Sequence, residues 1–178
     1  MRVLAISGSL RAGSSNTAVL RAMAALAPEE VQVVYYTGLS ELPHFNPDLD
    51  TEIPPSTVGD FRSQLMASDG VLISSPEYAH GVPGVLKNAL DWLVRSGELY
   101  EKPVAIVNAS PRSTHAQASL VETLTTMTAR LVPEACVTVA LPSKSLDAPG
   151  ICNDPEISRA LLLAITAFAR AVTPVASR

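Results

Sequence analysis

The chain has 178 residues, of which 47% are hydrophobic and 17% are charged, with a formal net charge of −4. This length predicts a single domain over residues 1–178 with one substantial core. The net negative charge argues against a nucleic-acid-binding protein, which would need a basic surface. The longest apolar stretch, ALLLAITAFA, is too short to span a membrane, and the opening run RVLAIS is too short for a signal peptide. We therefore expect a cytoplasmic protein with no membrane partner.

Short apolar runs rich in β-branched residues alternate with longer segments of helical periodicity along the chain. In chain order, the predicted strands cover residues 3–7, 31–36, 70–75, 104–109 and 136–141. The predicted helices cover residues 16–26, 57–67, 85–96, 116–131 and 155–172, and surface loops are predicted at 37–56 and 142–154. Strands this apolar are typical of a sheet that is buried on both faces. The alternation therefore predicts an α/β fold, a five-stranded parallel sheet with helices on both faces.

Three of the loops that follow predicted strands are rich in polar residues or glycine. They read SGSLRAGSSNT after the first strand, SPEYAHGVPG after the third and NASPRSTHAQ after the fourth. In a doubly wound sheet, ligands bind beyond the carboxyl ends of the strands, where the strand order reverses. These three loops are therefore predicted to form the binding site.

The first loop has the hydrogen-bond donors that a phosphate group requires. They are supplied by Ser9, Arg11, Ser14, Ser15, Asn16 and Thr17. Unpaired backbone N–H groups at the start of the following helix also favour an anion. The motifs GxxxxGK(S/T) and GxGxxG are absent, so the pattern indicates a terminal monophosphate rather than a triphosphate or a pyrophosphate. The alternatives are a serine that only caps the helix and a serine nucleophile, for which no GxSxG motif is present.

The second loop leads into a longer motif that indicates a family. GSLRAGSSNT, ELPHFNPDLD and above all PEYAHGVPGVLKNALDW resemble the NADPH-dependent FMN reductases, a family that includes flavin, quinone, azo and chromate reductases. The resemblance extends from the first strand to about Leu93. It implies a flavodoxin-like fold, a bound FMN and NADPH or NADH as the electron donor. It also implies a homodimer or homotetramer, with the apolar stripe of residues 85–93 as a candidate subunit contact.

The resemblance further implies which residues bind the cofactor. The FMN phosphate would be held by Ser9, Arg11, Ser14 or Ser15, Asn16 and Thr17. The isoalloxazine ring would lie along Pro76, Glu77, Tyr78 and Gly81, largely through backbone groups, with Ser110 from the third loop. The first loop is thus assigned to the phosphate, and the second and third loops are assigned to the ring.

Several side chains in and after the second loop have two interpretations. Glu77 either contacts the cofactor or faces solvent with only its amide in use. His80 either overhangs the flavin or points into solvent. Trp92 is expected in the core or in a subunit interface, and Lys87 and Asp91 are expected to form an exposed pair that contributes little.

The third loop departs from the family's pattern because residues 109–115 include no glycine. Ser113 or Thr114 is expected to cap the following helix. Arg112 and His115 are the candidates for contacting a phosphate of the nicotinamide cofactor or an anionic substrate, and His80 is a further candidate for contacting the substrate. The candidates for recognising the additional ribose phosphate of NADPH are Arg11, Arg95 and Arg112.

The mechanism implied by the family is ping-pong. NAD(P)H stacks on the exposed flavin face and gives hydride to N5, and the oxidised nicotinamide then leaves. A small-molecule acceptor such as a quinone, an azo compound, chromate or free flavin takes the electrons from the same pocket, and no side chain is expected to be catalytic. One alternative is a non-enzymatic, flavodoxin-type electron carrier, whose surface would be more acidic and more aromatic around the flavin. Another is a phosphate-binding enzyme without flavin, which would need a nucleophile such as a cysteine in the first loop.

The two cysteines are predicted to be free. Cys136 lies within the apolar run ACVTVAL and is expected to be buried, whereas Cys152 is expected in a loop. Their spacing fits no CxxC motif and no histidines cluster with them, so neither a disulfide nor a metal site is expected.

Overall fold

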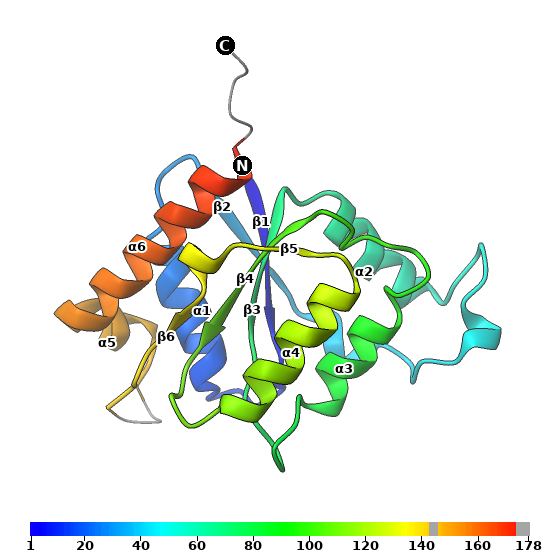
Figure 1. Ribbon diagram of the computed structural model, residues 1–178, viewed down its shortest axis with the longest axis horizontal. Helices are drawn as coiled ribbons and strands as arrows, with labels where there is room; N and C mark the ends of the chain where they lie inside the picture. The colour runs from blue at the N-terminus through cyan, green and yellow to red at the C-terminus, as the bar shows by residue number, and fades with distance from the viewer. Residues whose placement is uncertain (143–145, 174–178) are drawn as a thin grey trace.

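The computed structural model describes residues 1–142 and 146–173 and has a parallel sheet at its centre (Figure 1). The strands are β1 (Arg2–Ser7), β2 (Gln32–Tyr36), β3 (Gly70–Ser74), β4 (Pro103–Asn108), β5 (Arg130–Leu131) and β6 (Val137–Thr138). Their order is β2-β1-β3-β4-β5, and β6 also pairs with β4. Because β2 and β3 lie on opposite sides of β1, the strand order reverses there. The carboxyl ends of β1 and β3 therefore flank the crevice where such sheets bind ligands.

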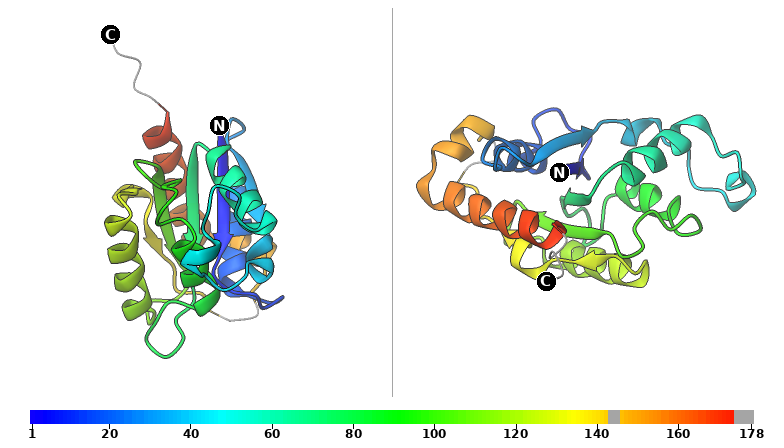
Figure 2. Two further views of the ribbon diagram at one scale, coloured as in Figure 1. Left: turned by 90° about the vertical axis from the view of Figure 1, so that its right-hand side faces the viewer. Right: turned by 90° about the horizontal axis from the view of Figure 1, so that it is seen from above.

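Helices cover both faces of the sheet, as Figures 1 and 2 show. They are α1 (Ser15–Ala25), α2 (Ser56–Met66), α3 (Gly84–Asp91), α4 (Thr114–Thr126), α5 (Ala148–Asn153) and α6 (Pro155–Val172). Three short 3₁₀ turns within the described residues are η1 (Gly38–Glu41), η2 (Pro47–Leu49) and η3 (Pro133–Ala135). Buried side chains of α1, α5 and α6 pack on one face, and those of α2, α3 and α4 pack on the other.

Alternating residues of β1 belong to the two different cores. Val3 and Ala5 pack with α1, α5 and α6, whereas Leu4 and Ile6 pack with α2, α3 and α4. All four are buried, and every residue of β3 and β4 is buried as well. Successive side chains of a strand point to opposite faces of the sheet. A central strand covered on both faces therefore needs an unbroken apolar run, which residues 3–6 supply.

The predicted parallel sheet is confirmed in its main strands but differs at one edge. The sequence predicts one strand over residues 136–141, whereas the structure has only the two residues of β6 there and a second short strand, β5, before it. η3 separates β5 from β6, so β5 pairs with the start of β4 and β6 with its end. The predicted helix 116–131 is correspondingly too long. α4 ends at Thr126, and Thr128 has a φ of 57°, which a helix cannot accommodate.

Two further element predictions are wrong. The predicted helix 85–96 ends at Asp91, after which the chain continues in turns. The stretch 142–154 contains α5, so Cys152 lies in a helix rather than in a loop; residues 143–145 of that stretch lie outside the described residues. α5 forms because Asp147 caps its start, its Oδ1 accepting a 2.9 Å hydrogen bond from the Gly150 N–H. Among the described residues, no helix is both long enough and apolar enough to cross a membrane.

Candidate functional site

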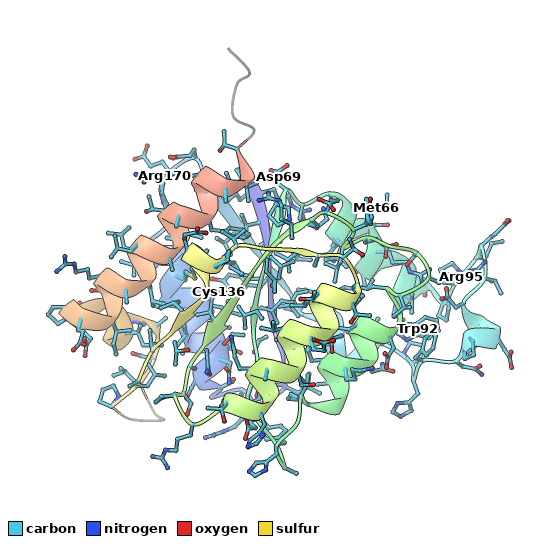
Figure 3. All side chains as sticks on the ribbon, in the orientation of Figure 1. Met66, Asp69, Trp92, Arg95, Cys136 and Arg170 are labelled. Atoms are coloured by element: carbon cyan, nitrogen blue, oxygen red, sulfur yellow. The ribbon has the colours of Figure 1, made fainter. Side chains whose placement is uncertain are left out.

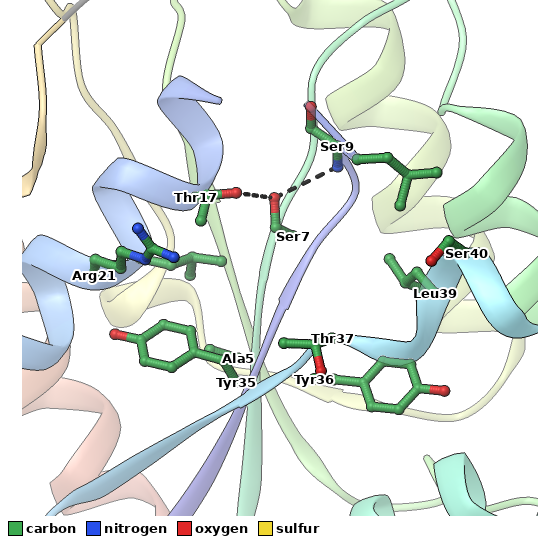
Figure 4. Close-up of a pocket in the computed structure, with 12 residues that line it drawn as sticks. Ala5, Ser7, Ser9, Thr17, Arg21, Tyr35, Tyr36, Thr37, Leu39 and Ser40 are labelled. Carbon is green, nitrogen blue, oxygen red and sulfur yellow. Dashed lines mark hydrogen bonds between the residues drawn. The ribbon is translucent and has the colours of Figure 1, made fainter. Parts of the chain in front are cut away.

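The first loop is organised around the hydroxyl of Ser7, the last residue of β1 (Figure 4). Thr17 Oγ1 donates a 2.8 Å hydrogen bond to Ser7 Oγ, and the Ser9 N–H donates to the same oxygen at 3.4 Å. Ser9 Oγ in turn accepts from the Arg11 N–H at 3.4 Å. The sequence reasoning did not single out Ser7 as a site residue. The only available signal was its place as the first polar residue after an apolar strand.

The start of α1 is fixed by two more residues of the predicted phosphate loop. Ser14 is the N-cap, and its Oγ accepts from the Thr17 N–H at 3.4 Å. Asn16 is buried, and its Oδ1 accepts a 2.9 Å hydrogen bond from Ser74 Oγ at the end of β3. Ser14 and Asn16 thus hold the loop in shape, which leaves the Asn16 side-chain N–H groups as its donors toward a ligand.

The loop also approaches the end of β3 closely, and Gly8 makes this possible. A Cβ on Gly8 would lie 3.0 Å from Leu86 Cδ2 and 3.1 Å from Ser75 Oγ, which is tighter than ordinary contact. The Gly8 N–H donates to the Ser74 carbonyl oxygen at 2.8 Å. The phosphate loop is therefore docked directly against the strand that leads into the second loop.

The donor set of the first loop fits a phosphate monoester such as that of FMN. α1 has no acidic residue in its first turn, so no carboxylate there offsets the partial positive charge at the helix start. Arg11 is exposed and adds a full positive charge. Hydroxyl groups, amide N–H groups and one guanidinium together match a dianionic group with three acceptor oxygens.

The second loop forms a tight reverse turn at its tip. The Tyr78 N–H donates to the Gly81 carbonyl oxygen at 3.1 Å, and the Gly81 N–H donates back to the Tyr78 carbonyl oxygen at 3.0 Å. The two residues between them, Ala79 and His80, have φ values of 49° and 60°. Two successive positive φ angles define a turn that normally contains glycine or asparagine. An alanine and a histidine in these positions store strain of about 1 kcal/mol or more each.

The second and third loops are joined by side chains. Glu77 Oε2 accepts a 2.9 Å hydrogen bond from the Ala116 N–H in the first turn of α4. The interpretation in which Glu77 faces solvent is therefore wrong for its side chain, because the first-turn N–H groups of α4 need acceptors. Ser113 takes the N-cap position of this helix, as expected, but its side chain makes no capping hydrogen bond.

A second contact between the same loops is an aromatic stack. The imidazole rings of His80 and His115 lie 4.2 Å apart, centroid to centroid, with an angle of 17° between their planes. His80 is exposed, as one of its two interpretations expected, but its ring is not isolated because it stacks on His115. The predicted substrate candidates His80 and His115 are brought together by the fold, and Arg112 lies exposed in the same third loop.

The third loop is held by Asn108, the last residue of β4, which the sequence reasoning missed. Its Oδ1 accepts from the Ser110 N–H at 3.1 Å, and its Nδ2 donates to the Ser113 carbonyl oxygen at 3.4 Å. Ser110 Oγ accepts from the Arg112 N–H at 3.3 Å. These side-chain bonds to the backbone shape a loop that contains no glycine.

Other singled-out residues lie away from these loops, as Figure 3 shows for Trp92 and Arg95. Trp92 is fully buried, and its Nε1 donates to the Pro43 carbonyl oxygen at 2.8 Å, which confirms a core role. Arg95 donates to the Asp50 carbonyl oxygen, so its guanidinium is engaged away from the three loops and does not serve the NADPH phosphate. Lys87 and Asp91 form the predicted pair across one helical turn.

The cysteines are free thiols outside the three loops. Cys136 is only partly buried, and its Sγ accepts from the Ile106 N–H at 3.4 Å. Burial raises the pKa of this thiol. Cys152 Sγ lies 3.8 Å from the Ala22 carbonyl oxygen, to which it donates. Both side chains therefore pack between elements.

A doubly wound sheet whose first loop at the switch point is rich in hydrogen-bond donors is typical of proteins that bind a phosphorylated ligand, and comparisons with known proteins identify the class. The sequence profile of the NADPH-dependent FMN reductases matches residues 1–142. A probable NADPH:quinone oxidoreductase of Oryza sativa subsp. japonica is 35% identical over 95% of this chain and 89% of that protein. An NAD(P)H-dependent FMN reductase of Pseudomonas aeruginosa is 36% identical over 88% of this chain and 86% of that protein.

Solved structures give the same result. FerB, a flavoenzyme NAD(P)H:(acceptor) oxidoreductase from Paracoccus denitrificans, superposes with a TM-score of 0.78 at 27% identity and covers 96% of each chain. A flavodoxin from Bacillus cereus superposes with a TM-score of 0.63 at 18% identity, covering 97% of this chain and 100% of that one, and so shows the fold alone. The chain belongs to the NADPH-dependent FMN reductase family. This membership confirms the predicted flavodoxin-like fold, the FMN cofactor with a nicotinamide donor, and the oxidoreductase class.

Proposed function

We propose that this protein carries electrons from NADPH or NADH to a planar small-molecule acceptor of the quinone type, using FMN seated on the first loop. The observation that carries this proposal is the hydrogen-bonded loop around Ser7 and Thr17, which precedes a helix without an acidic residue in its first turn. When bound, FMN supplies the redox chemistry, since it accepts a hydride at N5 and then passes the electrons to the acceptor. The residues of the chain bind the FMN, orient it and shield it from water.

The phosphate group is assigned to the first loop. Arg11 supplies charge, and Ser14 and Thr17 set the direction of the first amides of α1. Preorganised donors of this kind bind an anion with little rearrangement, which favours tight retention of the cofactor. The full set of proposed phosphate ligands is Ser9, Arg11, Ser14, Ser15, Asn16 and Thr17.

The flavin ring is assigned to the second and third loops. Since the Glu77 carboxylate is engaged by the Ala116 N–H, we assign only the backbone of Glu77 to the ring. Tyr78 is 57% exposed, so its phenol ring offers an uncovered apolar surface beside the ligand. The proposed ring contacts are Pro76, Glu77, Tyr78, Gly81 and Ser110.

The acceptor is assigned to the outer edge of the same loops. The stacked imidazoles of His80 and His115 present flat aromatic surfaces, and Arg112 adds a positive charge. Flat, electron-poor acceptors stack on such surfaces, and a carbonyl oxygen that gains negative charge is stabilised by nearby N–H donors. This supports a quinone over chromate, which offers no ring to stack.

A homodimer or homotetramer in the cytoplasm completes the proposal. The stripe expected to form a subunit contact is buried within the chain itself, since Leu86, Ala89 and Leu90 belong to the core under α3. The exposed Val94 and Tyr100, which follow α3, take its place as the proposed contact. Two free cysteines are consistent with a reducing compartment.

The test is an anaerobic titration of the purified protein with FMN and then with NADPH or NADH. We expect bound FMN to bleach promptly without a lasting radical species, and steady-state rates with a quinone to give the parallel double-reciprocal lines of a ping-pong mechanism. Bound FMN that stays oxidised with both nicotinamides would instead indicate an electron carrier reduced by a protein partner. Failure to bind FMN would overturn the proposal.

A further inference from the structure

The turn at the tip of the second loop is strained although it is not buried. Ala79 and His80 have φ values of 49° and 60°, and both residues are exposed. Neither is the glycine or asparagine that such a turn normally contains. Strained backbone of this kind persists only where the surrounding structure holds it in place. Because no core covers this turn, individual contacts must hold it.

The hydrogen bonds inside the turn do not offset this strain. The N–H groups of Tyr78 and Gly81 each donate to the carbonyl oxygen of the other residue. The same two bonds would form in a turn with glycines at both central positions, which would carry no strain. The ring of Tyr78 adds little packing, since the residue is 57% exposed. A contact from outside the turn is therefore needed to hold it in this form.

That contact is the stack of the His80 ring on the His115 ring, with centroids 4.2 Å apart and an angle of 17° between the planes. His115 lies in the first turn of α4, and the next residue, Ala116, donates its N–H to Glu77 Oε2. The start of α4 thus contacts the second loop twice, at Glu77 before the turn and at His80 within it. Figure 1 shows this loop protruding at the bottom of the view, beside the start of α4. A side chain on a helix is a more rigid support than one on a loop.

The stack also restricts how His80 meets a ligand. One face of its imidazole lies against His115, so only the other face and the ring edge are open to a second flat molecule. Stacked rings hold each other at a defined offset and angle. His115 therefore acts on the acceptor through His80.

We propose that His115 is a positioning residue, whose ring holds the strained turn at Ala79 and His80 closed and thereby sets the place of His80 in the acceptor site. The first part of this proposal stands on the contacts between the two loops alone. The second part rests on the proposed function, because it concerns the acceptor.

Amide hydrogen exchange in the full chain, followed by NMR, tests the first part. The N–H groups of Tyr78 and Gly81 are bonded across the turn, so they exchange when it opens. In His115→Ala we expect both to exchange about fivefold faster, the size expected for the loss of one aromatic pair. The Leu120 N–H in the middle of α4 should keep its rate.

Two further variants show whether the ring is responsible. His115→Phe retains an aromatic ring that can stack on His80 and should restore slow exchange. His44→Ala, at an exposed histidine between η1 and η2, is the matched control and should leave all three rates unchanged. Unchanged exchange in His115→Ala overturns the proposal. Equal acceleration at Leu120 also overturns it, because His115 would then stabilise α4 rather than the turn.

Steady-state kinetics of the FMN-loaded protein test the second part. His115→Ala should raise the KM for a quinone about threefold at unchanged kcat, and His115→Phe should keep the parental KM. A rise in KM that phenylalanine does not restore would show that the imidazole itself contacts the acceptor, and would overturn the positioning role. Absence of quinone turnover would overturn the proposed function instead. The exchange rates, which require neither FMN nor quinone, would still decide whether His115 holds the turn.

Discussion

The Glu77 carboxylate accepts a 2.9 Å hydrogen bond from the backbone N–H of Ala116, so a side chain from the β3–α3 loop caps helix α4. The two residues are 39 positions apart in the chain. Their contact replaces the local serine cap that most helices use. It also anchors the loop assigned to the flavin ring to the loop assigned to the acceptor.

Replacing Glu77 with alanine is expected to lower the free energy of unfolding by about 1 kcal/mol, the usual loss on removal of a helix cap. Glu77→Gln is the matched variant, because its amide oxygen also accepts a hydrogen bond, and it should retain most of the stability. Urea denaturation followed by circular dichroism measures both. An alanine variant as stable as the parent would show that this bond does not cap α4.

The positive φ angles of Ala79 and His80 give a second prediction. Ala79→Gly should raise the free energy of unfolding by about 0.5 kcal/mol, because relief of the backbone strain outweighs the extra entropy of glycine in the unfolded chain. His80→Gly relieves similar strain but also removes the stack on His115. It should therefore raise the KM for a quinone, whereas Ala79→Gly should not. Thermal denaturation and acceptor kinetics test the pair, and equal KM values in the two variants would remove His80 from the acceptor site.

A third prediction concerns Ser7. Its Oγ accepts from both Thr17 Oγ1 and the Ser9 N–H, so Ser7→Ala releases two groups of the phosphate loop at once. We expect FMN to bind about tenfold more weakly, equivalent to the loss of about one hydrogen bond's net contribution. Ser63→Ala, which removes an exposed hydroxyl bonded to the Gly59 carbonyl oxygen in α2, is the control. Flavin fluorescence quenching measures the dissociation constants, and an unchanged value for Ser7→Ala would exclude Ser7 as an organiser of the site.

The central sheet was predictable because each of its long strands contains a run of apolar residues. β3 and β4 are buried throughout, and near-continuous apolar runs of this length are typical of parallel strands covered on both faces. The short strands β5 and β6 were not predictable, since two residues carry no periodicity. Their pairing depends on η3 and on the free edge of β4, which are properties of the assembled sheet.

The structure brings the first and second loops, and the second and third loops, into contact, but the roles of their side chains were not all predictable from the sequence. A serine before a helix is a local signal for a cap, so a serine cap was one of the expected alternatives, and Ser14 takes that position. The Glu77–Ala116 bond and the Asn16–Ser74 bond join distant segments, so no local pattern reveals them. The role of Asn108 could not be predicted for another reason: it ends a buried strand, where an apolar residue is expected.

The last prediction concerns pH. Burial, aided by the charge of Asp60, raises the pKa of Tyr36 to about 12 from its ordinary value of 10.0. The folded state therefore holds the phenol proton more tightly than the unfolded state does. This contribution to stability is complete below about pH 10 and is lost as the pH rises toward 12.

Tyr36→Phe keeps the ring that packs 4.5 Å from Phe61, centroid to centroid, and removes the titrating hydroxyl. Its free energy of unfolding should fall less steeply than that of the parent between about pH 10 and pH 12. Lys102, whose pKa is lowered by burial, favours the folded state as the pH rises, but it does so equally in both proteins and cancels in the comparison. Urea denaturation at a series of alkaline pH values measures these slopes, and identical slopes for Tyr36→Phe and the parent would mean that the phenol is free to ionise in the folded protein.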